Sequence, residues 1–501
     1  MTTETYLHSL ESITLSQIVK EEYRNYQIYT LMDRAIPYLQ DGLKPGQRRI
    51  LYTLWKNQSK GLLKVSSATG LVLTLHPHGP ASVESAIVNM AQDYTFSNNY
   101  PLIDKKGYFG ERMETDAAAS RYIECKLGKV AEYLLFDDMD QVDMVPNYDE
   151  RTMEPVGLLP KLPLMLLNGA EGIGTGFSSS IPSFHHRDIV KSMIFYVENG
   201  KARKLKPYVH DYTLPIEIDH KGKLIFHMSF EEIDGSIFIT ELPRGYDSSK
   251  IYKHLSKFIE TGFIKDFVDS SVSNEIMIEL LFKKGQDVTL KEVKETIGVK
   301  STFSPNYTLI SERGVRIFNK AESIIEIFTD ERLKVVKRRY ELRCEKLEEK
   351  LTQNNEIIRF IKKKEYEVAT KQKNRKSFVE YLVKNKYVYA DYLADMPIYR
   401  MTKEEVEKRK LMITEDKKKL LEYTKVAKSD RLVAKKLIEE LQEVDDNLTA
   451  WRKQKDQEKE KLLKKIAKEQ DKLGKKKAQK VEKKEAKKKK AKKKAKKKVK
   501  K

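Results

Sequence analysis

A heptad pattern in the last third of the chain is the strongest constraint on its fold. The apolar seam there has spacings of four, three, four, seven and three residues, and consists of Tyr340, Cys344, Leu347, Leu351, Ile358 and Ile361. Such a seam is typical of a coiled coil, and Asn354 is its one polar position. Thr402 and Glu405 form a capping box that starts a second long helix. We therefore expect an antiparallel coiled coil over residues 321–450, with a small helical knob at about 375–400.

The predicted knob is rich in tyrosine, with five in the 26 residues from 376 to 401. Aromatic side chains are enriched at protein interfaces. The knob is therefore either a contact surface or a packed helical tip, and the sequence favours neither.

Composition excludes several classes of protein. Two cysteines, Cys125 and Cys344, are too few for a disulfide framework and are wrongly spaced for a zinc knuckle. The N-terminus has no basic segment followed by an apolar run, which a signal peptide requires. The most apolar stretch, VGLLPKLPLMLLNGA, is too short to span a bilayer, and we expect no membrane role. The chain's 501 residues are enough for two or three domains, and the two cysteines indicate a reducing cytoplasm.

The net charge of +22 is concentrated at the C-terminus. Residues 475–501 contain 18 Lys and 2 Glu, a net charge of +16, which leaves +6 for the other 474 residues. Such a block cannot bury a core, so we expect residues 451–501 to form a Lys-rich tail that is disordered or transiently helical. The tail is either simply solvated or a salt-dependent phosphate binder without sequence preference.

The first two thirds of the chain show two regions of different composition. Residues 25–149 are expected to form short helices separated by turns. In SVESAIVNMAQDY, Val83 and Ile87 lie on one helix face, and Ser82 is placed to cap the helix. Compact helices with a following wing suit a helix-turn-helix module, whose second helix enters the major groove of DNA. Residues 150–320 contain β-branched segments, such as GKLIFHMSF and GSIFITELP, and a helix at SSKIYKHLSKFIETG, which predicts an α/β domain.

Two other motifs carry weak signals. GAEGIGTGFSSS superficially offers a dinucleotide-binding loop, but its spacing is GxGxG and not GxGxxG. Close backbone packing, or close approach to a phosphate chain, explains these glycines better. The run DDMDQVD, residues 137–143, is expected to be a solvated acidic turn and not a metal cluster.

Tyr122 follows Arg121 in AAASRYIECK and allows two interpretations. A Tyr on an amphipathic helix is usually a half-buried packing residue. A Tyr nucleophile, by contrast, needs a cation or base, because a phenol titrates at about pH 10. Arg121 supplies a permanent charge that suits a phosphate oxygen as well as a phenolate. The dipeptide alone favours the packing interpretation.

Two further clusters are candidate anion sites. His76 and His78 flank a proline and could bind a metal, but no third ligand is evident. Donation to a phosphate or to a leaving oxygen fits their charge setting better. In DGLKPGQRRILYTLW, Lys44, Arg48 and Arg49 lie at a Pro-Gly turn and a helix start, which together make an anion site.

Three stretches taken together resemble the DNA breakage-and-rejoining subunit of type IIA topoisomerases, the topoisomerase IV and gyrase A-subunit family. They are DRAIPYLQDGLKPGQRRILYTLW, HPHGPASVESAIVNMAQDY and AAASRYIECKL, in that family's order and at its separations. LPLMLLNGAEGIGTGFSSSIPSFHHRDIV and DMPIYRMTKEE continue the resemblance, which covers about residues 20–450.

The resemblance implies a multidomain α+β fold. An N-terminal arm is expected at 1–24, a winged-helix DNA-gate domain at 25–149 and an α/β tower at 150–320. A coiled coil with a helical exit-gate dimerisation knob is expected at 321–450, and the Lys-rich tail at 451–501.

The same resemblance implies roles for individual residues. Tyr122 would be the nucleophile that bonds the 5′ phosphate, and Arg121 would stabilise the pentavalent phosphate. Ile173 would wedge between base pairs and bend the DNA. Five basic residues would bind DNA and support the transition state: Arg34, Lys44, Arg49, His76 and His78.

Partners and cofactors are also implied. The substrate would be double-stranded DNA, and two copies of this chain would form a homodimer. The ATPase domain and the acidic metal-binding domain would lie on a separate B-type subunit, giving an A2B2 heterotetramer that holds Mg²⁺ and ATP on the partner. Relatives carry a β-pinwheel where this chain has its Lys-rich tail, so we expect relaxation or decatenation, in association with the nucleoid.

Three other functions fit parts of the sequence. A gyrase-like supercoiling subunit would normally carry the pinwheel. A tyrosine recombinase needs Arg and His well upstream of a C-terminal Tyr, whereas Tyr122 lies early. A non-enzymatic DNA-binding scaffold would keep the coiled coil and the basic tail without needing the Arg-Tyr pair.

Overall fold

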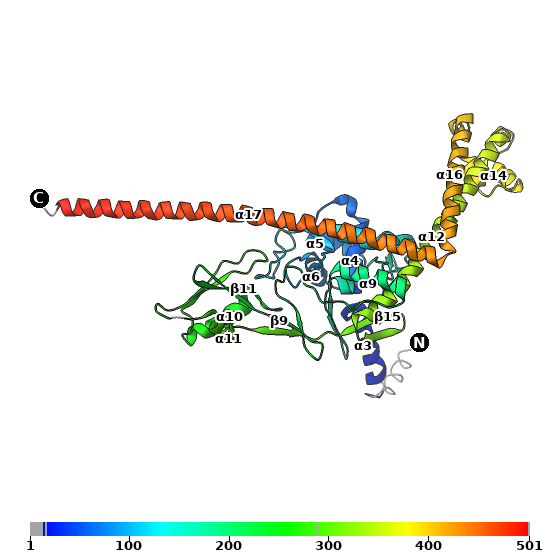
Figure 1. Ribbon diagram of the computed structural model, residues 1–501. Helices are drawn as coiled ribbons and strands as arrows, with labels where there is room; N and C mark the ends of the chain where they lie inside the picture. The colour runs from blue at the N-terminus through cyan, green and yellow to red at the C-terminus, as the bar shows by residue number, and fades with distance from the viewer. Residues whose placement is uncertain (1–13, 16–17, 287, 499–501) are drawn as a thin grey trace, which may run out of the picture. The chain divides into compact units, whose positions relative to one another are not determined.

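The structure is a computed structural model that describes residues 14–15, 18–286 and 288–498. The chain divides by its contacts into two units, Met1–Val444 and Asp445–Lys501. The first unit mixes helices with several small sheets (Figure 1). None of the described helices combines the length and the apolar composition needed to cross a lipid bilayer.

Residues 18–91 are mostly helical. The elements are η1 (Ile18–Tyr23), α3 (Arg24–Thr30), η2 (Leu31–Ala35), α4 (Pro45–Lys56), η3 (Gln58–Lys60), α5 (Val65–Val72) and α6 (Pro80–Ala91). Both α4 and α6 begin at a proline, whose fixed φ suits the first helical position. The prediction that Ser82 caps α6 was wrong, because Gly79 is the N-cap and the Ser82 hydroxyl donates to its carbonyl (2.9 Å). The predicted face at Val83 and Ile87 is buried.

A three-stranded antiparallel sheet follows these helices. Its order is β1-β3-β2, formed by Leu63–Lys64, Glu124–Leu127 and Ile103–Lys106. Cys125 and Leu127 on β3 are buried, whereas Lys126 is exposed, as alternation along a strand requires. Burial raises the pKa of the Cys125 thiol to about 12, so this cysteine is inert.

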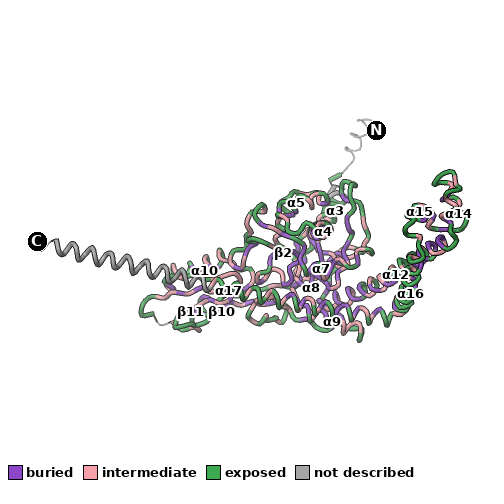
Figure 2. The backbone as a smooth tube through the Cα atoms, turned by 90° about the horizontal axis from the view of Figure 1, so that it is seen from above, coloured by how far each residue is buried: buried purple, intermediate pink, exposed green. Residues whose placement is uncertain are grey.

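Short elements connect this sheet to the middle region. They are α7 (Lys129–Leu135), η4 (Met139–Gln141), β4 (Met144–Pro146), β5 (Met153–Pro155), α8 (Leu164–Leu167), β6 (Ala170–Ile173), β7 (Ser178–Ile181) and α9 (His186–Asn199). Helices α7 and α8 are largely buried, and buried backbone gathers around them and α4 (Figure 2).

The middle region has the predicted strands and helix. Strands β10 (Ser229–Ile233), β11 (Ser236–Glu241), β13 (Ile278–Leu281) and β12 (Asp266–Asp269) form one sheet in that order. Strands β14 (Lys300–Phe303), β9 (Leu224–His227) and β8 (Glu217–Ile218) form another. Buried side chains of α10 (Ser248–Glu260) and α11 (Leu290–Thr296) pack with those of the first sheet into one core. The hairpin β15 (Tyr307–Ser311)–β16 (Gly314–Phe318) leads to the long helices.

The long helices are α12 (Ala321–Lys362) and α16 (Lys403–Ala427), which pack side by side. Thr402 caps α16 as predicted, because its side chain accepts from the Glu405 N–H. The polar seam residue Asn354 is buried and accepts a hydrogen bond from Arg409 Nη1 (2.6 Å). Between them lie α13 (Glu365–Ala369), α14 (Arg375–Lys384), α15 (Ala390–Ala394) and η5 (Ile398–Arg400), around a core of their own.

The last helix, α17, runs from Asp430 to Lys498. Of the two states expected for residues 451–501, disordered or transiently helical, the described part of the segment is a helix. Ala, Lys, Glu and Gln, which dominate this segment, have high helix propensities, so the helix continues from its N-terminal turns. Residues 499–501 lie outside the described residues.

Candidate active site and nucleic-acid interface

Tyr122 lies in the turn that enters β3 and not on a helix. Its side chain is 65% exposed, and its backbone N–H donates to the Ala119 carbonyl (2.9 Å). The Arg121 guanidinium carbon lies 4.6 Å from the centroid of the phenol ring. The interpretation of Tyr122 as a half-buried helix residue is therefore wrong, and the phenol is accessible with a cation beside it.

A row of alternating charges lies next to Tyr122. Glu124 on β3 is paired in register with Lys64 on β1 and with Lys106 on β2. Its carboxylate forms ion pairs with both amines, at 3.2 and 3.0 Å. The Lys64 amine also lies 3.5 Å from the Tyr122 carbonyl oxygen. Sequence reasoning missed this row, because its three members come from different strands that are distant in sequence.

Four of the predicted basic residues form a second group, in which Arg34, Arg49 and His78 lie near His76. The fifth, Lys44, lies near Glu171 instead. The rings of His76 and His78 lie edge to face, 5.1 Å apart, and Gly46 at the start of α4 lies against His76. Burial lowers the pKa of His76 to about 4, with further contributions from the charges of Arg49, His78 and Arg34.

His76 should therefore be neutral at pH 7. Its pKa in the folded state lies below the ordinary value of 6.5, so the unfolded chain takes up the proton first as pH falls. Folding stability is then lost as pH falls from about 6.5 to about 4. NMR titration of the imidazole, assigned with His76→Gln, should give a midpoint below about 5. A midpoint above 6 would contradict the half-buried, cation-flanked environment of the ring.

Two arginines of the predicted anion site already have carboxylate partners. Arg49 forms two hydrogen bonds with Glu154, 105 residues away, at 2.5 and 2.8 Å. Arg48 is buried and donates to Asp41 at 2.6 and 3.2 Å, so it is a structural residue and not part of an open anion site. No pattern in the sequence indicated either partner.

Ile173 stands at the tip of the hairpin β6–β7 and is 89% exposed. The hairpin is packed closely on η2, because a side chain at Gly172 would collide with the Ala35 carbonyl. Burial lowers the pKa of Lys44, which lies near Glu171 of the same hairpin. Close backbone packing thus accounts for this glycine.

Replacing Gly172 by alanine should lower the free energy of unfolding by about 1–3 kcal/mol, because the new Cβ would overlap the backbone of η2. Gly70→Ala in α5 is the matched control, since no atom lies within 4 Å of its Cβ. Alanine there should be neutral or stabilising by up to about 1 kcal/mol. Equal thermal melting of the two variants would refute close packing at Gly172.

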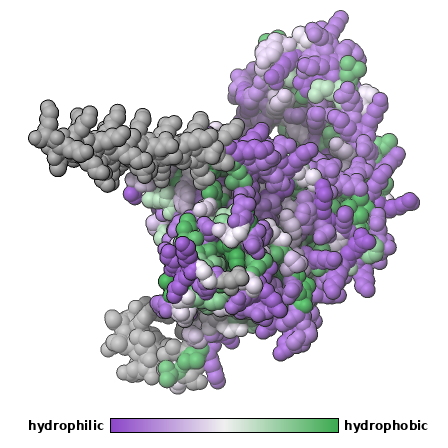
Figure 3. Space-filling model, turned by 60° about the vertical axis from the view of Figure 1, so that its left-hand side comes forward, coloured by the Kyte–Doolittle hydropathy of each residue, from purple (hydrophilic) through white to green (hydrophobic). Residues whose placement is uncertain are grey.

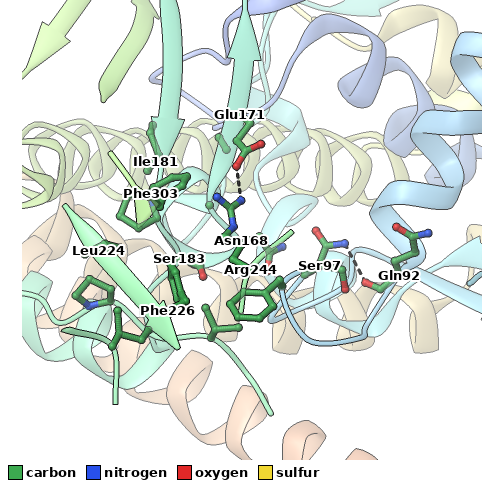
Figure 4. A pocket seen from close by; sticks show the side chains of 18 of the residues that line it. Gln92, Ser97, Asn168, Glu171, Ile181, Ser183, Leu224, Phe226, Arg244 and Phe303 are labelled. Atoms are coloured by element: carbon green, nitrogen blue, oxygen red, sulfur yellow. Dashed lines mark hydrogen bonds and ion pairs between the residues drawn. The ribbon is translucent and has the colours of Figure 1, made fainter. Parts of the chain in front are cut away.

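A cavity of about 400 Å³ lies at the base of the same hairpin (Figure 4). Arg244 and Glu171 form an ion pair at its edge, and the Arg244 guanidinium lies over the Phe303 ring. The lining residues include none of the predicted site residues. The predicted site residues therefore lie outside this cavity.

The acidic run at 137–143 differs in part from the expectation of a solvated turn. The run is only partly solvated: Asp137, Asp140 and Asp143 are exposed as expected. Asp138 differs, because it is buried and ion-paired with Arg332 and Arg339. Within the described part of the chain, no group of three or more His, Cys, Asp or Glu could hold a metal ion. Hydrophilic side chains dominate the face that Figure 3 shows, with smaller hydrophobic patches among them.

Tyr122 and Arg121 form one part of the site and the His76 group another. Ser66 at the start of α5 connects to the Tyr122 turn, through a hydrogen bond from its N–H to the Ser120 carbonyl (3.3 Å). Helices α5 and α6 also contact each other, and the His76–His78 segment connects them in sequence. Among the residues that the structure describes, no hydrogen bond, ion pair or ring contact joins the two groups directly.

Comparisons with known proteins identify the family of this chain. The family profile for the A subunit of DNA gyrase/topoisomerase IV matches residues 34–442. The DNA gyrase A subunit of Chlamydia trachomatis is 29% identical, over 86% of this chain and 55% of its own length. "DNA topoisomerase 2, mitochondrial" of Dictyostelium discoideum is 32% identical, over 71% of this chain and 28% of its own length.

A solved structure is similar as well. The crystal structure of the Plasmodium falciparum topoisomerase II DNA-binding, cleavage and re-ligation domain aligns with a TM-score of 0.75 and 25% identity. The alignment covers 88% of this chain and 65% of that one. This chain spans from about a quarter to just over half of the two relatives' lengths. Because the family profile covers most of it, the chain belongs to the A-subunit family of DNA gyrase and topoisomerase IV.

Proposed function

We propose that this chain is the DNA-cleaving and resealing subunit of an ATP-dependent type II topoisomerase. The enzyme passes one duplex through a transient double-strand break in another and favours relaxation or decatenation. The observation that carries this proposal is the exposed Tyr122, which has the Arg121 guanidinium over its ring in a chain of this family.

The chemistry is a reversible exchange of phosphodiester bonds. The Tyr122 oxygen attacks a backbone phosphorus in line with the 3′ oxygen, a new O–P bond forms, and the P–O3′ bond breaks. The phenol proton passes to solvent, and the 3′ oxygen leaves as a hydroxyl after taking up a proton. Arg121 offsets the charge that develops on the phosphate oxygens. Resealing is the reverse reaction, with the bond energy kept in the phosphotyrosine.

The supporting residues are those of the second group, together with Lys44. Arg34, Lys44, His76 and His78 hold the DNA backbone, and neutral His76 can donate one N–H to a phosphate. Arg49 contributes if the DNA phosphate shares it with Glu154, to which it is bonded. Ile173 enters between base pairs, a role supported by its exposure at the hairpin tip.

The domain roles follow the same proposal. Residues 25–149 are the winged-helix DNA gate, 150–320 the tower, and 321–450 the coiled coil and exit gate. The knob exposes Val388, Ile398 and Tyr399 at 76%, 82% and 72%, which supports its use as a homodimer contact. We place Mg²⁺ and ATP on a B-type partner subunit, in an A2B2 enzyme. Bound Mg²⁺ would stabilise the phosphate charge and the leaving 3′ oxygen.

The test uses this chain, a candidate ATPase subunit of the same family, Mg²⁺ and labelled duplex DNA. After denaturation, the protein should remain attached to the 5′ ends of cleaved strands. Attachment at the 3′ ends would instead indicate recombinase chemistry. Absence of any covalent complex with active partner subunits would contradict the proposal.

A further inference from the structure

Arg112 lies outside both groups of site residues, in the loop between β2 and Tyr122. It is only 3% exposed, and the guanidinium carbon lies 5.0 Å from the Phe96 ring centroid. Its guanidinium donates to three backbone carbonyls just after β11: Tyr246 (2.6 Å), Leu242 (3.0 Å) and Pro243 (3.3 Å). A buried cation held by main-chain oxygens is an unusual anchor, because burying a charge is costly unless it is well bonded.

The neighbouring residue strengthens the same attachment. The carbonyl of Met113 accepts a hydrogen bond from the N–H of Ser248, the first residue of α10 (2.9 Å). The Met113 side chain packs against the hydrophobic core of the β10–β13 sheet. Residues 112 and 113 are therefore inserted into the middle region of the chain.

The rest of the loop is tied to the α6 side of the molecule. Gln92 Nε2 donates to the carbonyls of Phe109 (2.9 Å) and Thr115 (3.2 Å), which closes the loop at its base. Gly110 has φ +87°, and a side chain there would collide with the Thr115 carbonyl. The Ala118 N–H then donates to the Tyr108 carbonyl (3.0 Å), four residues before Tyr122. The loop is thus a stiff connection from the middle region to the Tyr122 turn.

We propose that Arg112 is a positioning residue that fixes the Tyr122 turn relative to the β10–β13 sheet. The inference rests on the proposed function, in which the DNA lies against both parts and the phenol must meet the phosphorus in line. An error of about 1 Å in such a geometry can cost about a hundredfold in rate. Arginine is required because its planar fork reaches several carbonyls at once, whereas the single amine of lysine cannot.

The experiment compares Arg112→Met and Arg112→Lys with wild type in two measurements. The first is hydrogen exchange of the chain alone, which follows the amides of residues 108–122 without requiring activity. The second is the rate of covalent attachment to duplex DNA in the presence of Mg²⁺ and the ATPase subunit. Ile297→Val is the matched control, since it perturbs the same hydrophobic core at the end of α11 without touching Arg112's bonds.

Arg112→Met should speed exchange in 108–122 and slow attachment, each by about tenfold or more, with DNA affinity within about twofold. Arg112→Lys should give exchange and attachment rates between those of Arg112→Met and wild type. Ile297→Val should lower the melting temperature but change neither measurement. Unchanged exchange in Arg112→Met, or an equal effect of Ile297→Val, would overturn the positioning role. A wild-type chain that forms no covalent complex would contradict the proposed function, while the exchange data would still decide the role of Arg112.

Discussion

Replacing Arg332 by methionine should lower the free energy of unfolding by about 3–5 kcal/mol. The Arg332 side chain is only 1% exposed. Its Nη1 lies 2.8 Å from the Asp138 carboxylate, and its Nε donates to Glu440 (2.8 Å). Methionine fills a similar volume but leaves two buried carboxylates facing a single remaining cation, Arg339. Most of the expected loss of stability comes from the buried carboxylate charge that no longer has a cation to balance it.

This cluster joins three segments that are distant in sequence. Asp138 precedes η4, Arg332 and Arg339 lie on α12, and Glu440 lies in the first turns of α17. Arg339 bonds Asp138 through two nitrogens, at 2.6 and 2.7 Å, and pairs with Glu440 at 2.6 Å. Arg332 Nη1 also donates to the Leu159 carbonyl (3.0 Å). The base of the long helices is therefore held by two cations and two anions that balance each other.

Arg338→Met is the control, since Arg338 is exposed on α12 and, within the described residues, pairs only with Glu341 and Glu345. Exposed pairs contribute little, so its melting temperature should equal that of wild type. Both variants are compared by thermal and urea unfolding at pH 7. A wild-type melting temperature in Arg332→Met would show that the cluster contributes nothing net to stability.

The same cluster makes the folding stability depend on pH. Burial opposes ionisation of Asp138, but hydrogen bonds and charge from Arg339 and Arg332 outweigh it and lower its pKa below 3.8. A carboxyl with a lowered pKa in the folded state stabilises the fold above the ordinary pKa. That contribution is lost as pH falls through the lower, folded-state value. Acid unfolding of the long-helix region should accordingly begin below about pH 4.

Periodic features of the fold could be predicted from the sequence. The capping box at Thr402, the strands on either side of residue 235 and the helix at 248–260 are local patterns, and local patterns need no partner to be recognised. Tyr122 was identified as a candidate because three motifs in order resemble a known family. Its exposure in a turn was not predicted, since the short motif does not distinguish a helix from a turn before a strand.

Long-range pairing could not be predicted. Arg49 meets Glu154 across 105 residues, and Arg332 meets Glu440 across 108 residues and Asp138 across a still longer separation. A single sequence contains no signal for which carboxylate a given arginine will find. The acidic run at 137–143 therefore read as solvated, although Asp138 is 1% exposed. Arg112 was missed for the same reason, because its partners are carbonyls, which every residue has.

Replacing Tyr122 by phenylalanine should abolish covalent attachment to DNA, a loss of at least about a thousandfold. The change removes one oxygen atom, the only nucleophile in the proposed reaction. Since the ring is exposed and its backbone N–H still reaches Ala119, the fold and the position of Arg121 should be kept. Melting temperature and equilibrium DNA binding are expected to match wild type.

Tyr148→Phe is the matched control, since Tyr148 is also exposed, at 56%, in the turn between β4 and β5. It should attach to DNA at the wild-type rate. Attachment is measured with labelled duplex, Mg²⁺ and the ATPase subunit, and the labelled peptide is then sequenced. If Tyr122→Phe still became attached to DNA, the nucleophile would be another residue. Arg121, Lys64 and the loop before Tyr122 would then only bind phosphate. If Tyr122→Phe lost DNA binding as well, the phenol would be a contact and not only a nucleophile.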